Sequence, residues 1–191
     1  MILENKNIGI VFIGNFYIKD NLLIELNKMS QKSHINITPI FEKESNKEKQ
    51  SDICKRNSIF KNKAIFYLNN EINNISIKRF DILIFVGFTI ELLYKLNYKI
   101  FDNSIVKLIK MYEKENIPII LGLKTNIDIF IVFEQIKKLY NKSKYYFIPM
   151  IFPNPITKPE LIIFDPSMIS KTTEHALNKI QINPIISCNY I

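Results

Sequence analysis

Short, uninterrupted apolar runs are the main feature of the hydrophobic pattern. Three of these runs end directly before a glycine, in a chain that has only four glycines. The runs cover residues 8–13, 81–86 (apolar after Asp81) and 117–121, and the glycines that follow them are Gly14, Gly87 and Gly122. Apolar runs without polar alternation are typical of strands buried on both faces, as in a parallel sheet. A glycine at the carboxyl end of such a strand lets backbone or ligand approach closely.

Helical spacing of apolar residues appears between and after these strands, each time behind a polar residue that can cap a helix. The predicted helices begin at Asp20, Asn103, Asn126 and Asp165-Pro166. The helix after Asn126 is expected to pack through Phe130, Phe133, Ile136 and Tyr140. The last helix has proline at its first position and is expected to reach about residue 180.

Further strands are predicted at residues 34–40, 64–68 and 145–150. The resulting order, βαβ…βαβαβ…α, predicts an α/β fold: a doubly wound, mostly parallel sheet sandwiched by helices, flavodoxin- or Rossmann-like. We expect one domain over residues 1–191, with a polar loop at 41–63 that holds a short helix near 51–60. In such a fold the ligand crevice lies outside the carboxyl ends of the strands.

Composition narrows the classes of function. The formal net charge is +8, but the basic residues are almost all lysines, and arginine occurs only at Arg56 and Arg79. The side chains that recognise phosphates and bases are usually arginines, and the lysines form no continuous basic stripe along the sequence. We therefore do not expect nucleic-acid binding. Cys54 and Cys188 follow no metal or redox spacing, so no metal site is predicted. No signal peptide or spanning apolar run is found, and a cytoplasmic protein without membrane contact is expected.

Polar residues at the predicted strand ends are the candidates for a ligand site. No G-x-G-x-x-G or P-loop motif is present, so a standard dinucleotide or ATP site is not supported. Gly14, Asn15 and Phe16 open the first crossover, where backbone N–H groups can bind a phosphate; a plain turn is the alternative. Thr89 and Lys95 flank the second crossover and can hold an anion.

Two further segments complete the candidates. Thr125-Asn126 is either a helix cap or a ligand contact, and Lys158 stands in a loop stiffened by prolines. No catalytic triad or carboxylate pair can be assigned. The residues alone leave three classes open: a flavin or nucleotide enzyme, a non-catalytic partner subunit, or a small-acid-binding protein.

A set of residues spread along nearly the whole chain carries a family resemblance. It comprises Ile8-Gly9, Gly14, Phe80-Asp81, Thr89, Lys95-Leu96, Asp102, Lys110, Asn116, Pro118, Leu121-Gly122, Thr125-Asn126, Phe147-Ile148-Pro149, Pro155, Lys158-Pro159, Thr172, Glu174, Ala176-Leu177, Gln181 and Pro184-Ile185. In these positions the chain resembles the B subunits of dipicolinate synthases, within the flavoprotein-like group that includes flavin-dependent cysteine decarboxylases. From Lys95 to Ile185 the register matches without a gap.

The resemblance implies a B subunit that acts with an A subunit carrying a nicotinamide (NAD(P)) Rossmann domain. Together they form dipicolinic acid from dihydrodipicolinate or its hydrated precursor during sporulation, in the mother-cell cytoplasm of a spore former. A hetero-oligomer with an exposed apolar patch is expected. A dicarboxylate substrate needs cations, for which Lys95 and Lys158 are the candidates, with Arg56 as a third. The group's cofactor is FMN, with Gly14, Asn15, Phe16, Gly87, Thr89, Glu91, Lys95, Thr125 and Asn126 as the implied cofactor site.

Departures from the family pattern bear on that cofactor. Bulky Phe16 and Tyr17 follow Gly14, and Glu91 stands where the family has a neutral asparagine. We therefore expect flavin binding to be weak or lost, and Glu91→Asn to improve it if the charge is the main obstacle. The alternative function is a diverged flavin-fold subunit without cofactor or catalysis, serving as an interaction or regulatory protein.

Overall fold

The computed structural model describes residues 3–14, 20–42, 60, 66–68, 80–140 and 142–187. Within these residues, nine strands form one sheet in the order β3-β2-β1-β4-β5-β8-β7-β9, and β6 pairs with β5 beside that path. The strands are β1 (Asn7–Phe12), β2 (Asn36–Glu42), β3 (Phe66–Leu68), β4 (Ile82–Phe88), β5 (Ile119–Thr125), β6 (Tyr145–Phe147), β7 (Met150–Ile151), β8 (Ile162–Phe164) and β9 (Ile186–Ser187).

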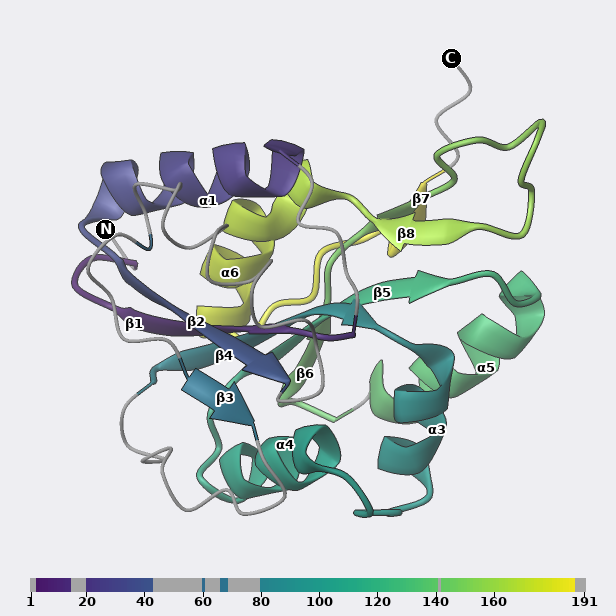
Figure 1. Cartoon of the computed structure of the whole chain (residues 1–191), viewed down its shortest axis with the longest axis horizontal. Helices are drawn as coiled ribbons and strands as arrows, with labels where there is room; N and C mark the ends of the chain where they lie inside the picture. Colours follow the sequence, from purple (N-terminus) through teal and green to yellow (C-terminus); the bar gives the residue numbers. More distant parts are fainter. Residues whose placement is uncertain are drawn as a thin grey trace.

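Helices cover both faces of the sheet (Figure 1). They are α1 (Asp20–Ser33), α3 (Ile90–Asn97), α4 (Ser104–Lys114), α5 (Ile129–Tyr140), the short 3₁₀ turn η2 (Pro166–Met168) and α6 (Ile169–Leu177). One hydrophobic core lies under α1 and α6, and the other lies under α3, α4 and α5. Strands β1 to β6 pair in parallel, and among the described strand pairs only β5–β8 and β7–β8 are antiparallel. The predicted doubly wound, mostly parallel α/β fold is confirmed.

Strand β4 shows why the apolar runs form the centre of the sheet. All its residues are buried, and alternate side chains enter opposite cores. Ile82 and Ile84 pack toward α1 and α6, whereas Leu83 and Phe85 pack toward α3, α4 and α5. Side chains of any strand alternate between its two faces. Because both faces of β4 are buried, both sets of side chains are apolar, and the sequence shows no alternation of polar and apolar residues.

The prediction for α5 is wrong in its cap and in most of its buried face, although Ile136 is buried as predicted. Asp128 Oδ1, not Asn126, accepts the Phe130 N–H at the start of the helix, at 2.7 Å. The buried side chains include Val132, Ile136 and Leu139, whereas Phe130 is 77% exposed. The helix carries two apolar stripes, and packing against the sheet selects the aliphatic stripe over the aromatic one.

The segment 145–150 is two strands rather than the one predicted. Pro149 lacks an N–H and separates β6 from β7. Strand β6 pairs with β5, whereas β7 pairs with β8 and β9. Strands β8 and β9 were not predicted because they are only three and two residues long. Strand β2 runs on to Glu42, beyond the predicted end at residue 40. The helix expected at 51–60 lies outside the described residues except for Phe60, which lies in a turn.

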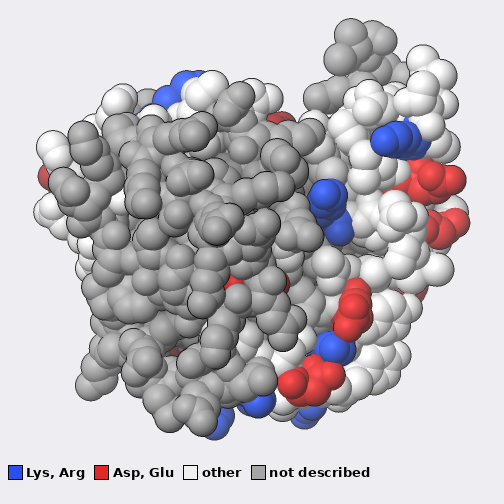
Figure 2. All heavy atoms as spheres, in the orientation of Figure 1, with Lys and Arg blue, Asp and Glu red and all other residues white. Residues whose placement is uncertain are grey.

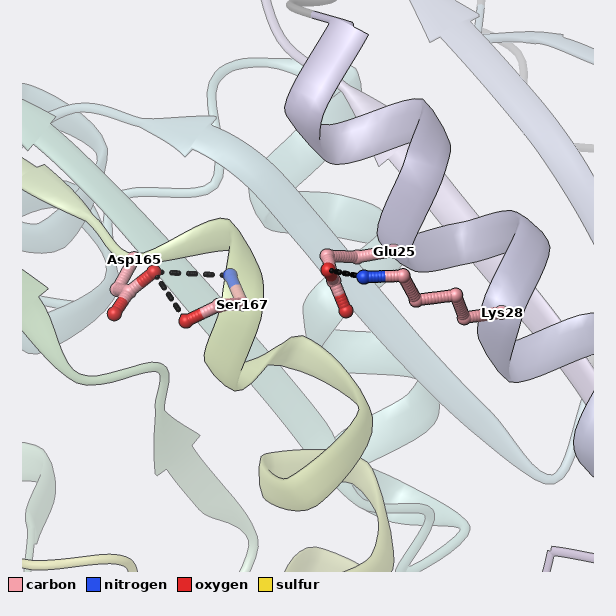
Figure 3. Close-up of polar contacts among 4 residues, drawn as sticks. All are labelled: Glu25, Lys28, Asp165 and Ser167. Carbon is pink, nitrogen blue, oxygen red and sulfur yellow. Dashed lines mark hydrogen bonds and ion pairs between the residues drawn. The ribbon is translucent and has the colours of Figure 1, made fainter.

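The start of the last helical segment is as predicted. Asp165 Oδ1 accepts hydrogen bonds from the Ser167 N–H at 2.9 Å and the Ser167 hydroxyl at 2.7 Å (Figure 3). Pro166 occupies the first helical position. The first turn is 3₁₀, and α6 ends at Leu177, earlier than the predicted residue 180. The same view shows Lys28 bound to Glu25 within α1, at 2.7 Å.

Candidate functional site

A crevice of about 440 Å³ lies where β1, β4 and β5 end. It is lined by Ile13, Gly14, Gly87, Thr89, Lys124, Thr125, Asn126 and Leu161. This is the sheet edge at which doubly wound folds bind their ligands. The structure therefore brings together Gly14, Gly87, Thr89, Thr125 and Asn126, which are far apart in the sequence and were all predicted as site residues.

Two glycines line the crevice, Gly14 in the turn after β1 and Gly87 near the end of β4. Gly14 has φ +60° and Gly87 has φ +81°, backbone conformations that other residues adopt only with strain. At Gly87 the pairing of β4 with β5 shifts register between Val86 and Phe88. Among the described residues, no atom lies within 4 Å of a Cβ built at Gly14, which leaves room for a ligand beside this residue. Its N–H, however, donates to Glu42 Oε2 at 2.8 Å.

Two threonine hydroxyls combine a local structural role with a place in the crevice. Thr89 Oγ1 accepts the Leu92 N–H at 3.3 Å and caps α3. Thr125 Oγ1 accepts the Ile127 N–H at 3.2 Å. A hydroxyl that accepts one bond still has a hydrogen to donate, so both threonines can bind an acceptor group of a ligand.

Lys124 and Leu161 line the crevice but were not among the predicted site residues. Lys124 is an exposed residue near the carboxyl end of β5, and it supplies a cation beside Thr125. The sequence does contain a feature that could have identified Lys124: it is a charged residue near the end of an apolar strand, directly before the candidate ligand residue Thr125. Leu161 directly precedes β8, and it could not be placed without that strand.

Other predicted residues lie elsewhere. Lys95 Nζ binds Glu91 Oε1 at 2.8 Å and Asp102 Oδ2 at 3.0 Å, and these bonds raise the pKa of Lys95. Neither Glu91 nor Lys95 is part of the crevice lining. Lys158 lies on an exposed turn, where its N–H donates to the Asn154 carbonyl at 2.8 Å. Three predicted site residues lie outside the described part of the chain: Asn15, Phe16 and Arg56.

Charges of both signs occur on the part of the surface that the structure describes (Figure 2). Figure 2 shows lysines and acidic residues intermixed on the described part of one face. In the described part of the chain, no group of His, Cys, Asp and Glu side chains could hold a metal ion. No described helix has the length and apolar character that crossing a membrane requires.

Similar structures define the class of protein. No family model matches the sequence. The FMN-dependent cysteine decarboxylase SpaF superposes with a TM-score of 0.62 at 12% identity, covering 94% of this chain and 98% of SpaF. The FMN-binding protein AtHal3 superposes with a TM-score of 0.55 at 11% identity, covering 89% and 95%. The fold is thus that of the flavoprotein-like α/β proteins.

Within this class, the chain is similar to the B subunit of dipicolinate synthase in sequence and in fold. The Bacillus subtilis (strain 168) protein is 26% identical over 110 residues, which are 58% of this chain and 55% of that protein. The chain thus spans about half the length of the curated relative it matches. The crystal structure of the B subunit from Bacillus halodurans has a TM-score of 0.77 at 18% identity, covering 98% of both chains. The resemblance seen in the sequence is confirmed.

Proposed function

We propose that the chain is the B subunit of a dipicolinate synthase. On this proposal it acts with a nicotinamide-dependent A subunit to form dipicolinic acid from dihydrodipicolinate or its hydrated precursor. The observation that carries the proposal is the similarity to the B subunits of two Bacillus dipicolinate synthases, in sequence over 110 residues and in fold over 98% of both chains. Sporulation and the mother-cell cytoplasm of a spore former are part of the same proposal.

The reaction divides the work between the two subunits. Converting dihydrodipicolinate to dipicolinate removes two electrons and two protons, and NAD(P)⁺ on the A subunit accepts the hydride. The hydrated precursor must first lose water. This chain contributes a binding surface, in which the Lys124 ammonium holds one substrate carboxylate and the hydroxyls of Thr89 and Thr125 donate to its oxygens. Lys158, on the turn before Leu161, is the proposed cation for the second carboxylate.

An exposed apolar patch on α5 supports the need for a partner. Phe130 is 77%, Ile131 42% and Phe133 44% exposed, in the helix that follows the crevice residues Thr125 and Asn126. Exposed apolar patches mark interaction surfaces, and permanent complexes have the more hydrophobic interfaces. The A subunit is proposed to dock there, next to the crevice that holds the substrate.

Flavin is not needed in this proposal. A Cβ at Gly14 would have no described atom within 4 Å, so a ligand could approach this turn, but Glu42 accepts the Gly14 N–H that a phosphate would take. This N–H is therefore not available to the phosphate of FMN, and we expect the purified chain to be colourless. The same contact favours a second candidate: a flavin-fold subunit without cofactor or catalysis, which would bind the A subunit without changing its turnover.

Co-purification with a tagged A subunit tests the partnership. The wild-type chain is expected to co-purify, and Phe130→Asp is expected to weaken the complex about tenfold or more, as the loss of an interface anchor does. Ile156→Asp is the matched control, because Ile156 is 93% exposed on a different segment, the turn between β7 and β8. Failure of the wild-type chain to bind, or equal loss in both variants, contradicts the proposed interface.

A further inference from the structure

A carboxylate from β2 lies against the first glycine turn of the crevice. Strands β1 and β2 pair in parallel, with Phe12 opposite Phe41, so the residues after both lie side by side. Glu42 follows Phe41 directly, and its Oε2 accepts the Gly14 N–H at 2.8 Å. The two residues are 28 positions apart in the sequence, and the parallel register alone brings them together.

The backbone N–H of Gly14 donates to a side chain, whereas the N–H of the preceding residue, Ile13, donates within the sheet. The Ile13 N–H donates to the Val86 carbonyl at 3.1 Å and is therefore committed to the sheet. Gly14 comes next, in a conformation with φ +60° and with no atom of the described residues within 4 Å of a would-be Cβ. A backbone N–H at the carboxyl edge of a parallel sheet is the kind of donor that binds a phosphate.

We propose that Glu42 is a specificity-determining residue that keeps phosphorylated cofactors such as FMN out of the crevice. Its carboxylate takes the donor that a phosphate oxygen would need. A phosphate brought to the same N–H would also lie beside a like charge, and that repulsion grows as the crevice excludes water. The crevice is thereby left to ligands without a phosphate.

Glu91 is the carboxylate expected from the sequence to oppose flavin, and its position argues against that role. Its side chain is 72% exposed and binds Lys95 at 2.8 Å, whereas Glu42 accepts the N–H of the lining residue Gly14. Because a cation compensates its charge at the surface, Glu91 has little effect on an anion in the crevice. Glu91 is therefore the natural control for Glu42.

On the opposite side of the crevice, Lys124 supplies a cation beside Thr125 and Asn126. The two charges make the crevice asymmetric, with an anion seated at the β1 turn and a cation at the end of β5. A small carboxylate can bind at Lys124 without approaching Glu42. The binding of a carboxylate at Lys124 rests on the proposed function, whereas the exclusion of phosphate by Glu42 does not.

Titration with FMN and riboflavin tests the proposal, because the two flavins differ only in the phosphate. The experiment uses the full chain without an A subunit, so its outcome is independent of synthase activity. Wild-type protein is expected to bind FMN no more tightly than riboflavin. Glu42→Gln removes the charge but keeps an acceptor near Gly14, and Glu42→Ala also frees the N–H. Both variants should bind FMN about tenfold or more tightly than wild type, a difference of about 1.4 kcal/mol, with riboflavin affinity unchanged.

The control is Glu91→Gln, which should leave the affinity for both flavins unchanged. Circular dichroism verifies that each variant is folded, and two variants at Glu42 guard against the failure of one. The proposal is overturned if wild type prefers FMN over riboflavin. It is equally overturned if neither Glu42 variant gains FMN affinity, or if Glu91→Gln gains as much as they do.

Discussion

Substitution of Gly14 separates two effects on stability, the strain of a left-handed backbone conformation and the packing of an added side chain. Its φ of +60° is unfavourable for any side chain, yet a Cβ there would meet no atom of the described residues within 4 Å. Gly14→Ala therefore introduces strain without a clash. A left-handed conformation costs an L-residue roughly 1–2 kcal/mol, and the stiffer unfolded chain offsets about 0.4–1 kcal/mol of this. We expect a loss of about 1 kcal/mol, and a smaller loss for Gly14→Asn because asparagine tolerates this conformation.

Gly9 is the matched control, because a side chain there would cause a clash without backbone strain. It has no positive φ, but a Cβ would lie 2.5 Å from Leu83 Cδ2 and 3.2 Å from Ile40 Cδ1. Gly9→Ala should cost about 1–3 kcal/mol through overpacking, and Gly9→Asn more, since it also buries a polar group.

Urea denaturation with thermal melts measures all four variants, and a loss of 1 kcal/mol corresponds to roughly 2–4 °C in a chain of this size. The reasoning is refuted if asparagine is worse than alanine at Gly14, or better than alanine at Gly9.

Single contacts carry three more predictions. Thr89→Ala and Asn103→Ala each remove a helix cap and should each cost about 1 kcal/mol of stability in denaturation, but only the first should alter ligand binding to the crevice. Lys124→Met should raise the KM for the dicarboxylate in the complex by about tenfold at nearly constant kcat, as the loss of a charge-assisted bond predicts; an unchanged KM removes Lys124 from the site. Burial, helped by the negative charge of Glu113, raises the pKa of Tyr145. The phenol is thus held neutral in the fold, and stability should fall above pH about 10, where the unfolded tyrosine ionises, by about 1.4 kcal/mol per pH unit. Tyr145→Phe should flatten that slope in denaturation curves, and an unchanged slope contradicts the assignment.

The parallel part of the sheet could be predicted because burial on both faces leaves an unambiguous pattern. The runs at 8–13, 82–86 and 117–121, which form most of β1, β4 and β5, lack polar side chains, and the glycines after the first two line the crevice. The strand ends therefore located Gly14, Gly87, Thr89 and Thr125-Asn126 from the order of residues alone.

The features that escaped prediction depend on tertiary contacts. Helix α5 carries two apolar stripes, and the one that is buried also buries Gln135, which accepts hydrogen bonds from Asn97 of α3. Local spacing cannot choose between such stripes. The contact of Glu42 with Gly14 depends on the pairing register of β1 and β2, which the sequence does not specify.

The rate of dipicolinate formation by an A subunit, measured with and without this chain, tests the central claim most directly. Dihydrodipicolinate or its hydrated precursor is supplied with NAD(P)⁺, and the product is quantified by chromatography. The account predicts little product from either subunit alone and sustained turnover when the two are combined. Full activity of the A subunit alone, of this chain alone, or an absence of turnover in the purified complex would contradict it.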